Sequence, residues 1–144
     1  MEIKEISDIN KFLVEISNID ESTKKAGREE LVILNLKDYT KDVALNAISN
    51  VLQKINNPIA IFSSRVNKKQ IINKILSNYS NIDYRKIESG QINSEEWEKL
   101  KKIIETLSKK EIYIDDTLEN SMQEIVAKSR DLKEKKDIRI IILN

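Results

Sequence analysis

The side chains best suited to chemistry follow three apolar runs of strand length. Lys41, Arg65 and the pair Asp115-Asp116 come after the runs at residues 31–36, 59–62 and 112–114. The carboxyl ends of parallel strands form the edge where α/β folds place function. A lysine there suits a phosphate, an arginine suits a phosphate or an acidic partner, and paired carboxylates suit a metal ion.

Each of these residues also has a plainer interpretation. Lys41 lacks a glycine-rich nest around it, so we favour a solvated lysine at the start of a helix. A strand-ending Asp115-Asp116-Thr117 is more often a turn and helix cap, and no metal site is expected. Arg65 is harder to dismiss, although surface arginines without a role are commoner.

Composition removes most classes of enzyme. The 144 residues contain no cysteine and no histidine, which excludes thiolate nucleophiles, disulfides, most zinc sites and histidine acid–base catalysis. The formal net charge is +1, without the basic excess of a protein that lives on nucleic acid, so direct DNA binding is expected to be weak or absent. A remnant that binds through the local lysines Lys24, Lys25, Lys68 and Lys69 stays open as a third possibility.

Strands and amphipathic helices alternate along the chain. Besides the three runs above, a fourth strand is expected over residues 138–143. Helices are expected over residues 43–55, 67–79, 94–107 and 122–132, with Asn67 and Gln70 forming an N-cap pair and Trp97 lying in the core. Residues 81–93 are mostly polar. The pattern predicts an α/β fold with a mainly parallel sheet and helices on both faces.

The N-terminal residues carry a helical stripe of their own. Ser7 or Asp8 is placed to cap a helix whose apolar face is Ile9, Phe12, Leu13 and Ile16. No stretch approaches the roughly 20 apolar residues of a membrane span, and a cytoplasmic location without membrane contact is the default expectation.

The order of segments from about Asp20 to Asn144 resembles the C-terminal ATPase domain of the bacterial replicative DNA helicase, the DnaB type. The most specific segments, in chain order, are Ile59-Ala60-Ile61-Phe62-Ser63, Ser89-Gly90-Gln91-Ile92, Glu95-Glu96-Trp97, Ile112-Tyr113-Ile114-Asp115-Asp116-Thr117 and Glu124-Ile125 with Ala127-Lys128. The resemblance implies a RecA-like, three-layer P-loop NTPase fold, from a family of hexameric ATP-driven motors on single-stranded DNA.

The departures from that family fall on its catalytic elements. The loop equivalent to the P-loop, Lys37, Asp38, Tyr39, Thr40, Lys41 and Asp42, contains no glycine, and the carboxylate of Asp42 repels phosphate. Arg65 stands where family members carry a catalytic glutamate, and a cation cannot act as that base. Asn144 stands at the aspartate that ends the Walker B strand, so the charge that anchors Mg²⁺ is missing.

The resemblance therefore predicts residues 1–19 as a linker-like helical arm and residues 20–144 as a RecA-like domain truncated after the Walker B-equivalent strand. In the family, the linker helix packs on the adjacent subunit of the ring, so Ile9, Phe12, Leu13 and Ile16 are a candidate interaction surface. An apolar stripe is equally able to fold back onto its own domain.

Our leading hypothesis is a catalytically inactive pseudo-ATPase. It would need no cofactor and would act as an interaction module on the replicative helicase, its loader or another copy of itself, modulating DNA replication. The alternative is a helicase fragment that binds ATP and Mg²⁺ and unwinds DNA with residues or subunits beyond this chain.

Overall fold

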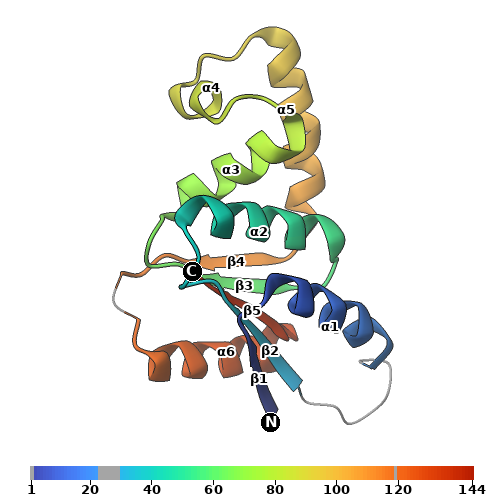
Figure 1. Cartoon of the computed structure of the whole chain (residues 1–144). Coiled ribbons are helices and arrows are strands. Elements are labelled where there is room, and N and C mark those ends of the chain that lie inside the picture. The colour runs from blue at the N-terminus through green and yellow to red at the C-terminus, as the bar shows by residue number, and fades with distance from the viewer. Residues whose placement is uncertain (1, 23–29, 119) are drawn as a thin grey trace.

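The described residues of the computed structural model, 2–22, 30–118 and 120–144, form one parallel sheet flanked by helices (Figure 1). The elements in chain order are β1 Glu2–Ile6, α1 Ile9–Ser22, β2 Glu30–Asn35, α2 Lys41–Lys54, β3 Ile59–Phe62, α3 Lys68–Ser80, α4 Tyr84–Ser89, α5 Ser94–Ser108, β4 Ile112–Asp115, α6 Met122–Lys136 and β5 Ile140–Leu143.

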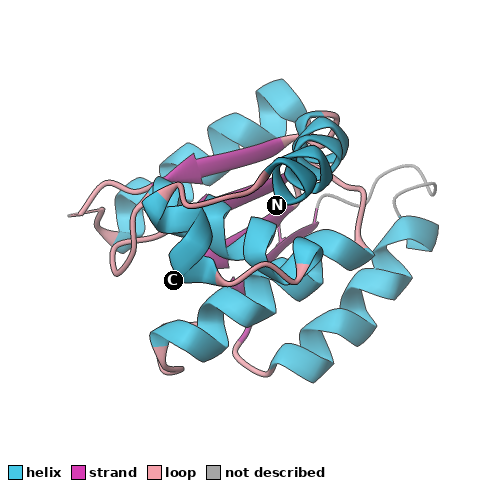
Figure 2. Cartoon of the chain, turned by 90° about the horizontal axis from the view of Figure 1, so that it is seen from above, coloured by secondary structure: helices cyan, strands magenta, loops and turns pink. Residues whose placement is uncertain are grey.

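The sheet has five strands in the order β1-β2-β5-β3-β4, and every neighbouring pair is parallel. The central strands are buried on both faces, which explains why β3 and β5 read as unbroken apolar runs rather than alternating ones. Helices lie on both sides of the strands in the view from above (Figure 2). The predicted three-layer α/β architecture is confirmed.

Two apolar cores lie on opposite faces of the sheet. The larger joins β1, β2, β3 and β5 to α1, α2 and α3, and the smaller joins the other face to α6. A third cluster, Leu76, Ile82 and Leu100, holds α3, α4 and α5 together beside the sheet. Among the described residues, no helix is long and apolar enough to cross a membrane.

The predicted helix starts are largely confirmed. Asn67 and Gln70 form the expected capping box at the start of α3, and Asp8 accepts a hydrogen bond from the backbone N–H of Lys11 at the start of α1. A second capping box joins Asn93 and Glu96 at the start of α5. These side chains fix where the helices begin because they satisfy backbone donors that the helix leaves unpaired.

Three sequence expectations were wrong. Residues 2–6, expected within a helical arm, form the edge strand β1 because they pair with β2. The polar stretch 81–93 contains a short helix, α4, which Asp83 caps and Gly90 ends at a positive φ of 78°. Trp97, expected in the core, is 45% exposed, with the Lys101 ammonium 5.7 Å from its ring centroid.

Candidate functional site

The carboxyl ends of β2, β5 and β3 meet at one edge of the sheet. Asn35 pairs with Leu143, and Leu143 pairs in turn with Phe62, so the three strands end level with one another. The residues that follow them are the loop 36–40, Asn144 and the turn that contains Arg65. The three positions where the sequence lacks catalytic groups are therefore brought together.

Arg65 lies at the centre of this edge. Its guanidinium donates to the backbone carbonyls of Leu36, at 2.9 Å, and Tyr39, and to the side-chain oxygen of Asn144 at 2.7 Å. The Nε atom of Arg65 is buried and has no hydrogen-bond partner. The guanidinium thus ties the loop after β2 to the residue after β5, and we call this set of contacts the arginine clasp.

Asn144 joins the clasp to the turn after β3. It is 1% exposed, and its side-chain amide donates to the hydroxyl of Ser63 at 3.2 Å. That hydroxyl donates in turn to the carbonyl of Val66 at 2.7 Å. The backbone supports the same arrangement, because the N–H of Asn144 donates to the carbonyl of Phe62. A short polar network therefore fixes the position that the family resemblance assigns to a lost aspartate.

The loop between β2 and α2 satisfies several of its own donors. The N–H groups of Leu36, Lys37 and Tyr39 donate to Leu143 O, Asn35 Oδ1 and Leu36 O, while the Thr40 side chain accepts from the N–H of Val43 as the N-cap of α2. No described residue of this loop has a positive φ. The αR–αL alternation of an anion-binding nest is therefore absent from it.

The remaining charged residues of the loop face solvent. Lys37, Asp38, Lys41 and Asp42 are all exposed, and Asp42 lies in the first turn of α2, where a carboxylate is favoured by the helix dipole. Tyr39 is half-buried, packs against the larger core and donates its hydroxyl to the carbonyl of Ser7 at 2.9 Å. The loop is thus held against the β1–α1 connection as well as against Arg65.

The apolar stripe of α1 folds back onto its own domain. Phe12 and Ile16 are 0% and 3% exposed within the larger core, and Ile9 and Leu13 pack against it. Of the two alternatives for this stripe, the structure follows the second. The side chains that would have served as an interaction surface are largely covered by the chain itself.

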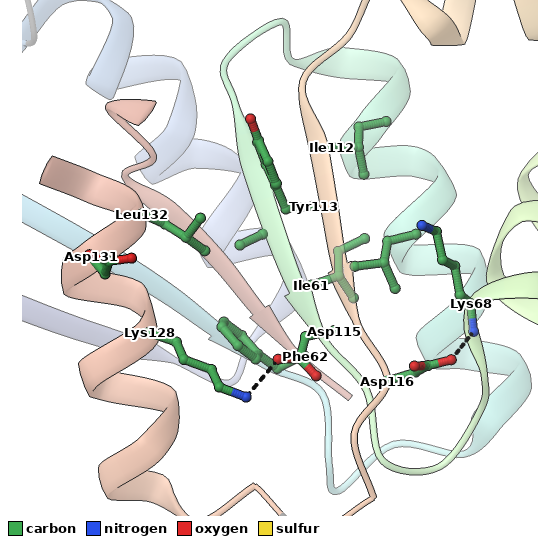
Figure 3. A pocket seen from close by; sticks show the side chains of 12 residues that line it. Ile61, Phe62, Lys68, Ile112, Tyr113, Asp115, Asp116, Lys128, Asp131 and Leu132 are labelled. Atoms are coloured by element: carbon green, nitrogen blue, oxygen red, sulfur yellow. Dashed lines mark hydrogen bonds and ion pairs between the residues drawn. The ribbon is translucent and has the colours of Figure 1, made fainter. Parts of the chain in front are cut away.

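A second charged group lies at the end of β4. Asp115 accepts from Lys128 at 2.9 Å and from the N–H of Thr117 at 3.0 Å, and these partners, the Thr117 side chain first, hold its pKa well below the ordinary value. Asp116 accepts from the N–H of Lys68 at 2.9 Å, at the start of α3. The interpretation of this pair as turn and cap residues agrees with these contacts (Figure 3).

These groups border a cavity of about 480 Å³ beside β4, whose other walls come from β3 and α6. Sequence reasoning missed the cavity, because its charged residues are far apart in the chain. Within the described residues, no three acidic side chains gather in a way that would hold a metal ion.

The fold and this edge define a class: a parallel, three-layer α/β domain of RecA-like type, with a loop and strand ends where related proteins handle nucleotides. The family described as the DnaB-like helicase C-terminal domain matches residues 12–144. This chain belongs to that family.

Curated relatives agree with that assignment. The replicative DNA helicase DnaB of Geobacillus stearothermophilus is 31% identical over 130 residues, which are 89% of this chain and 29% of that protein. The replicative DNA helicase DnaC of Bacillus subtilis (strain 168) is 30% identical over 95% of this chain and 31% of its own length. The chain therefore spans less than a third of the relatives it matches.

Solved structures share the fold. A DnaB-like replicative helicase, described with its interactions with primase, superposes with a TM-score of 0.64 and 20% identity, covering 90% of this chain and 38% of that one. A helicase-related ATPase domain superposes with a TM-score of 0.65 and 22% identity, covering 96% of this chain and 57% of that one.

Proposed function

We propose that this DnaB-like domain does not hydrolyse ATP and acts as a protein-interaction module in the cytoplasm, on the replicative helicase, its loader or another copy of itself, where it modulates DNA replication. One observation carries the proposal: the arginine clasp occupies the edge where a nucleotide would have to lie. Arg65 donates to Leu36 O, Tyr39 O and Asn144 Oδ1 there.

The groups at this edge do not fit a magnesium nucleotide. A triphosphate needs converging N–H donors and a carboxylate that anchors its Mg²⁺ ion. Here two carbonyl oxygens of the loop, those of Leu36 and Tyr39, point at a cation, so the loop presents acceptors where a phosphate requires donors. Asn144 supplies a neutral amide that is already bonded to Ser63 and Arg65.

The guanidinium of Arg65 is itself a poor substitute for a phosphate-binding lysine. Both of its terminal nitrogens are engaged with protein oxygens, and turning them towards a ligand would leave the carbonyls and Asn144 without their charged donor. Nucleotide binding would therefore have to dismantle the clasp first, and the cost would be subtracted from the binding free energy.

The interaction role is supported by what the chain retains. The sheet, its flanking helices and the segment order of the family are preserved over residues 12–144, while the groups for chemistry are replaced. A scaffold kept without its catalytic residues is suited to binding through its surface. The solved helicase described with primase adds primase as a further candidate partner.

Calorimetric titration with Mg-ATP tests the first half of the proposal. We expect no measurable heat at ligand concentrations up to about 1 mM, the weak end of specific binding. The Bacillus subtilis helicase serves as the positive control under the same conditions. Saturable binding to this chain with a micromolar dissociation constant would overturn the pseudo-ATPase proposal.

Light scattering of mixtures tests the second half. The chain is mixed in turn with the cognate helicase and its loader, and the proposal expects a complex with one of them or a self-associated form. If every mixture shows only the sum of its separate components, and the chain alone is monomeric, the interaction role is lost even when ATP binding is absent.

A fragment of an ATP-binding replicative helicase is the second candidate. The observation that favours it is the family match itself, together with the chain's coverage of only 29–31% of the curated relatives. In that case ATP and Mg²⁺ would be held with residues or subunits beyond this chain. The same Mg-ATP titration, repeated after adding the cognate helicase, separates the two, because only the fragment would gain nucleotide affinity in the mixture.

A further inference from the structure

The outer edge of β4 is unpaired within the described part of the chain. β4 ends the strand order and pairs with β3 alone. The carbonyls of Glu111 and Asp115 accept from Ile59 and Ser63, and because alternate residues of a parallel strand face its neighbour, those of Ile112 and Ile114 face away. Their N–H and C=O groups form a short open ladder at the side of the molecule.

Apolar surface adjoins this open ladder on the α3 and α5 side. A groove of about 300 Å³ runs between α3, α5 and β4, and its apolar lining includes Ile72, Ile104, Leu107, Ile112 and Ile114. Ile72 and Ile104 are 38% and 42% exposed. On the other face of β4, Tyr113 borders the larger cavity beside α6, so the strand lies between two hollows (Figure 3). An open edge between two hollows has the form of a site for an added strand.

The side chains along β4 complement those of a second, antiparallel β4. Only residues 112 and 114 face outward, so the register that uses both sets Ile112 opposite Ile114 of the second copy and makes Tyr113 face its own counterpart. The isoleucines then meet on the groove side, and the tyrosines meet at a non-hydrogen-bonded position, where cross-strand side chains lie closest. The same contacts repeat about a two-fold axis.

Charge is self-complementary in that register as well. The carboxyl end of one β4 lies beside the amino end of the other, which brings the Lys68 ammonium of one copy to the end where the second copy presents Glu111. No ion pair of either side chain is recorded among the described residues. Glu111 also faces Asp115 of the second copy, and this like-charge contact is offset because Lys128 already pairs with Asp115 at 2.9 Å.

We propose that two copies of this chain associate through antiparallel pairing of their β4 edges, forming one continuous sheet across a two-fold axis. The surface lies at the far edge of the sheet from β1, and the inference does not rest on the proposed function: the pairing uses no residue of the arginine clasp. A negative Mg-ATP titration and a negative dimer measurement are therefore separate results.

Sedimentation velocity over a concentration series measures the association. The monomer mass is 16.7 kDa, and we expect a concentration-dependent species of twice that mass and nothing larger, because two-fold edge pairing closes at two copies. A chain that stays monomeric up to about 1 mM, or one that assembles into larger rings, overturns the proposal.

Charge reversal tests the register. Lys68→Glu and Glu111→Lys each create a like-charge contact that occurs twice in the dimer, so each is expected to raise the dissociation constant about tenfold. The double variant restores the opposite pair and is expected to recover dimerisation. Lys102→Glu, a change of the same charge on an exposed lysine of α5 outside the groove, is the control. Failure of the double variant to recover overturns the register.

Hydrogen exchange supplies a readout that does not depend on any variant folding. The N–H groups of Ile112 and Ile114 face outward and should become protected as concentration rises, while that of Tyr113 faces β3 and should show no concentration dependence. Equal protection of all three at every concentration contradicts the pairing.

Discussion

Arg65→Met removes the arginine clasp while keeping a side chain of similar length. The wild-type guanidinium makes three hydrogen bonds, to Leu36 O, Tyr39 O and Asn144 Oδ1. A hydrogen bond from a charged donor is worth about 1.5–3 kcal/mol, but Arg65 is only partly buried and the freed loop carbonyls can reach water. We therefore expect a total loss of about 3 kcal/mol in the free energy of unfolding, well below the sum of three independent bonds.

Urea denaturation followed by far-ultraviolet circular dichroism measures this loss. In a thermal scan, 3 kcal/mol corresponds to a melting temperature lower by roughly 6–12 °C for a domain near this size. Arg130→Met on α6 is the matched control, since Arg130 is exposed and surface changes of this kind stay within about 0.5 kcal/mol. A loss below 1 kcal/mol for Arg65→Met would refute the clasp as a structural tie.

The same variant separates the two reasons for expecting no nucleotide. Removing Arg65 empties the edge but leaves a loop with no glycine, so Mg-ATP is still expected to give no heat in calorimetry. If Arg65→Met binds the nucleotide while the wild type does not, the clasp alone excludes it and the argument from the loop fails.

Three further predictions concern stability. Asp115→Asn should cost about 1 kcal/mol at neutral pH, because it weakens an ion pair with the partly exposed Lys128; since the folded pKa of Asp115 lies below 3.8, this difference should be complete above that value and shrink as the pH falls through it, as urea midpoints across pH will show. Asn67→Ala should lose about 1 kcal/mol through the broken capping box, with an unchanged m-value. Phe12→Ala should lose about 3–5 kcal/mol if α1 packs on its own domain, and a loss under 1 kcal/mol by denaturant titration would place that helix elsewhere.

The central part of the fold was predictable because it depends on local pattern. Strands β2, β3, β4 and β5 are apolar runs, and helices α2, α3, α5 and α6 carry apolar stripes at helical spacing, so their types were predicted correctly. The capping box of Asn67 and Gln70 was also visible, because both partners lie within four residues of each other. Alternation of these elements was sufficient to predict a parallel sheet with helices on both faces.

The elements that were missed depend on distant partners. β1 has the composition Glu-Ile-Lys-Glu-Ile, which shows little strand preference, and it is a strand because β2 offers a free edge beside it. α4 has only six residues and is held by its caps and by packing of Ile87 against the third cluster. Trp97 falls on the apolar stripe of α5, but α5 protrudes beside the sheet and leaves that turn of the stripe uncovered (Figure 1).

For the candidate site, the sequence indicated the positions but not their contacts. The family resemblance identified Arg65, Asn144 and the loop as places where catalytic groups are missing. That the three touch one another follows from the register Asn35–Leu143–Phe62, which no local pattern determines. The sequence therefore predicted a loss of chemistry, while the bonds that replace it required the three-dimensional structure.

The replacement contacts have a common physical cause in the missing glycines. An anion-binding nest needs residues with positive φ, where side chains other than glycine are disfavoured. The loop 36–40 has none, so it turns with ordinary backbone angles and directs the carbonyls of Leu36 and Tyr39 to the edge of the sheet. Those carbonyls need a donor, and a glutamate at position 65 would place negative charge beside them. An arginine there supplies the donors, so the loss of the glycines and the presence of Arg65 stabilise the same structure.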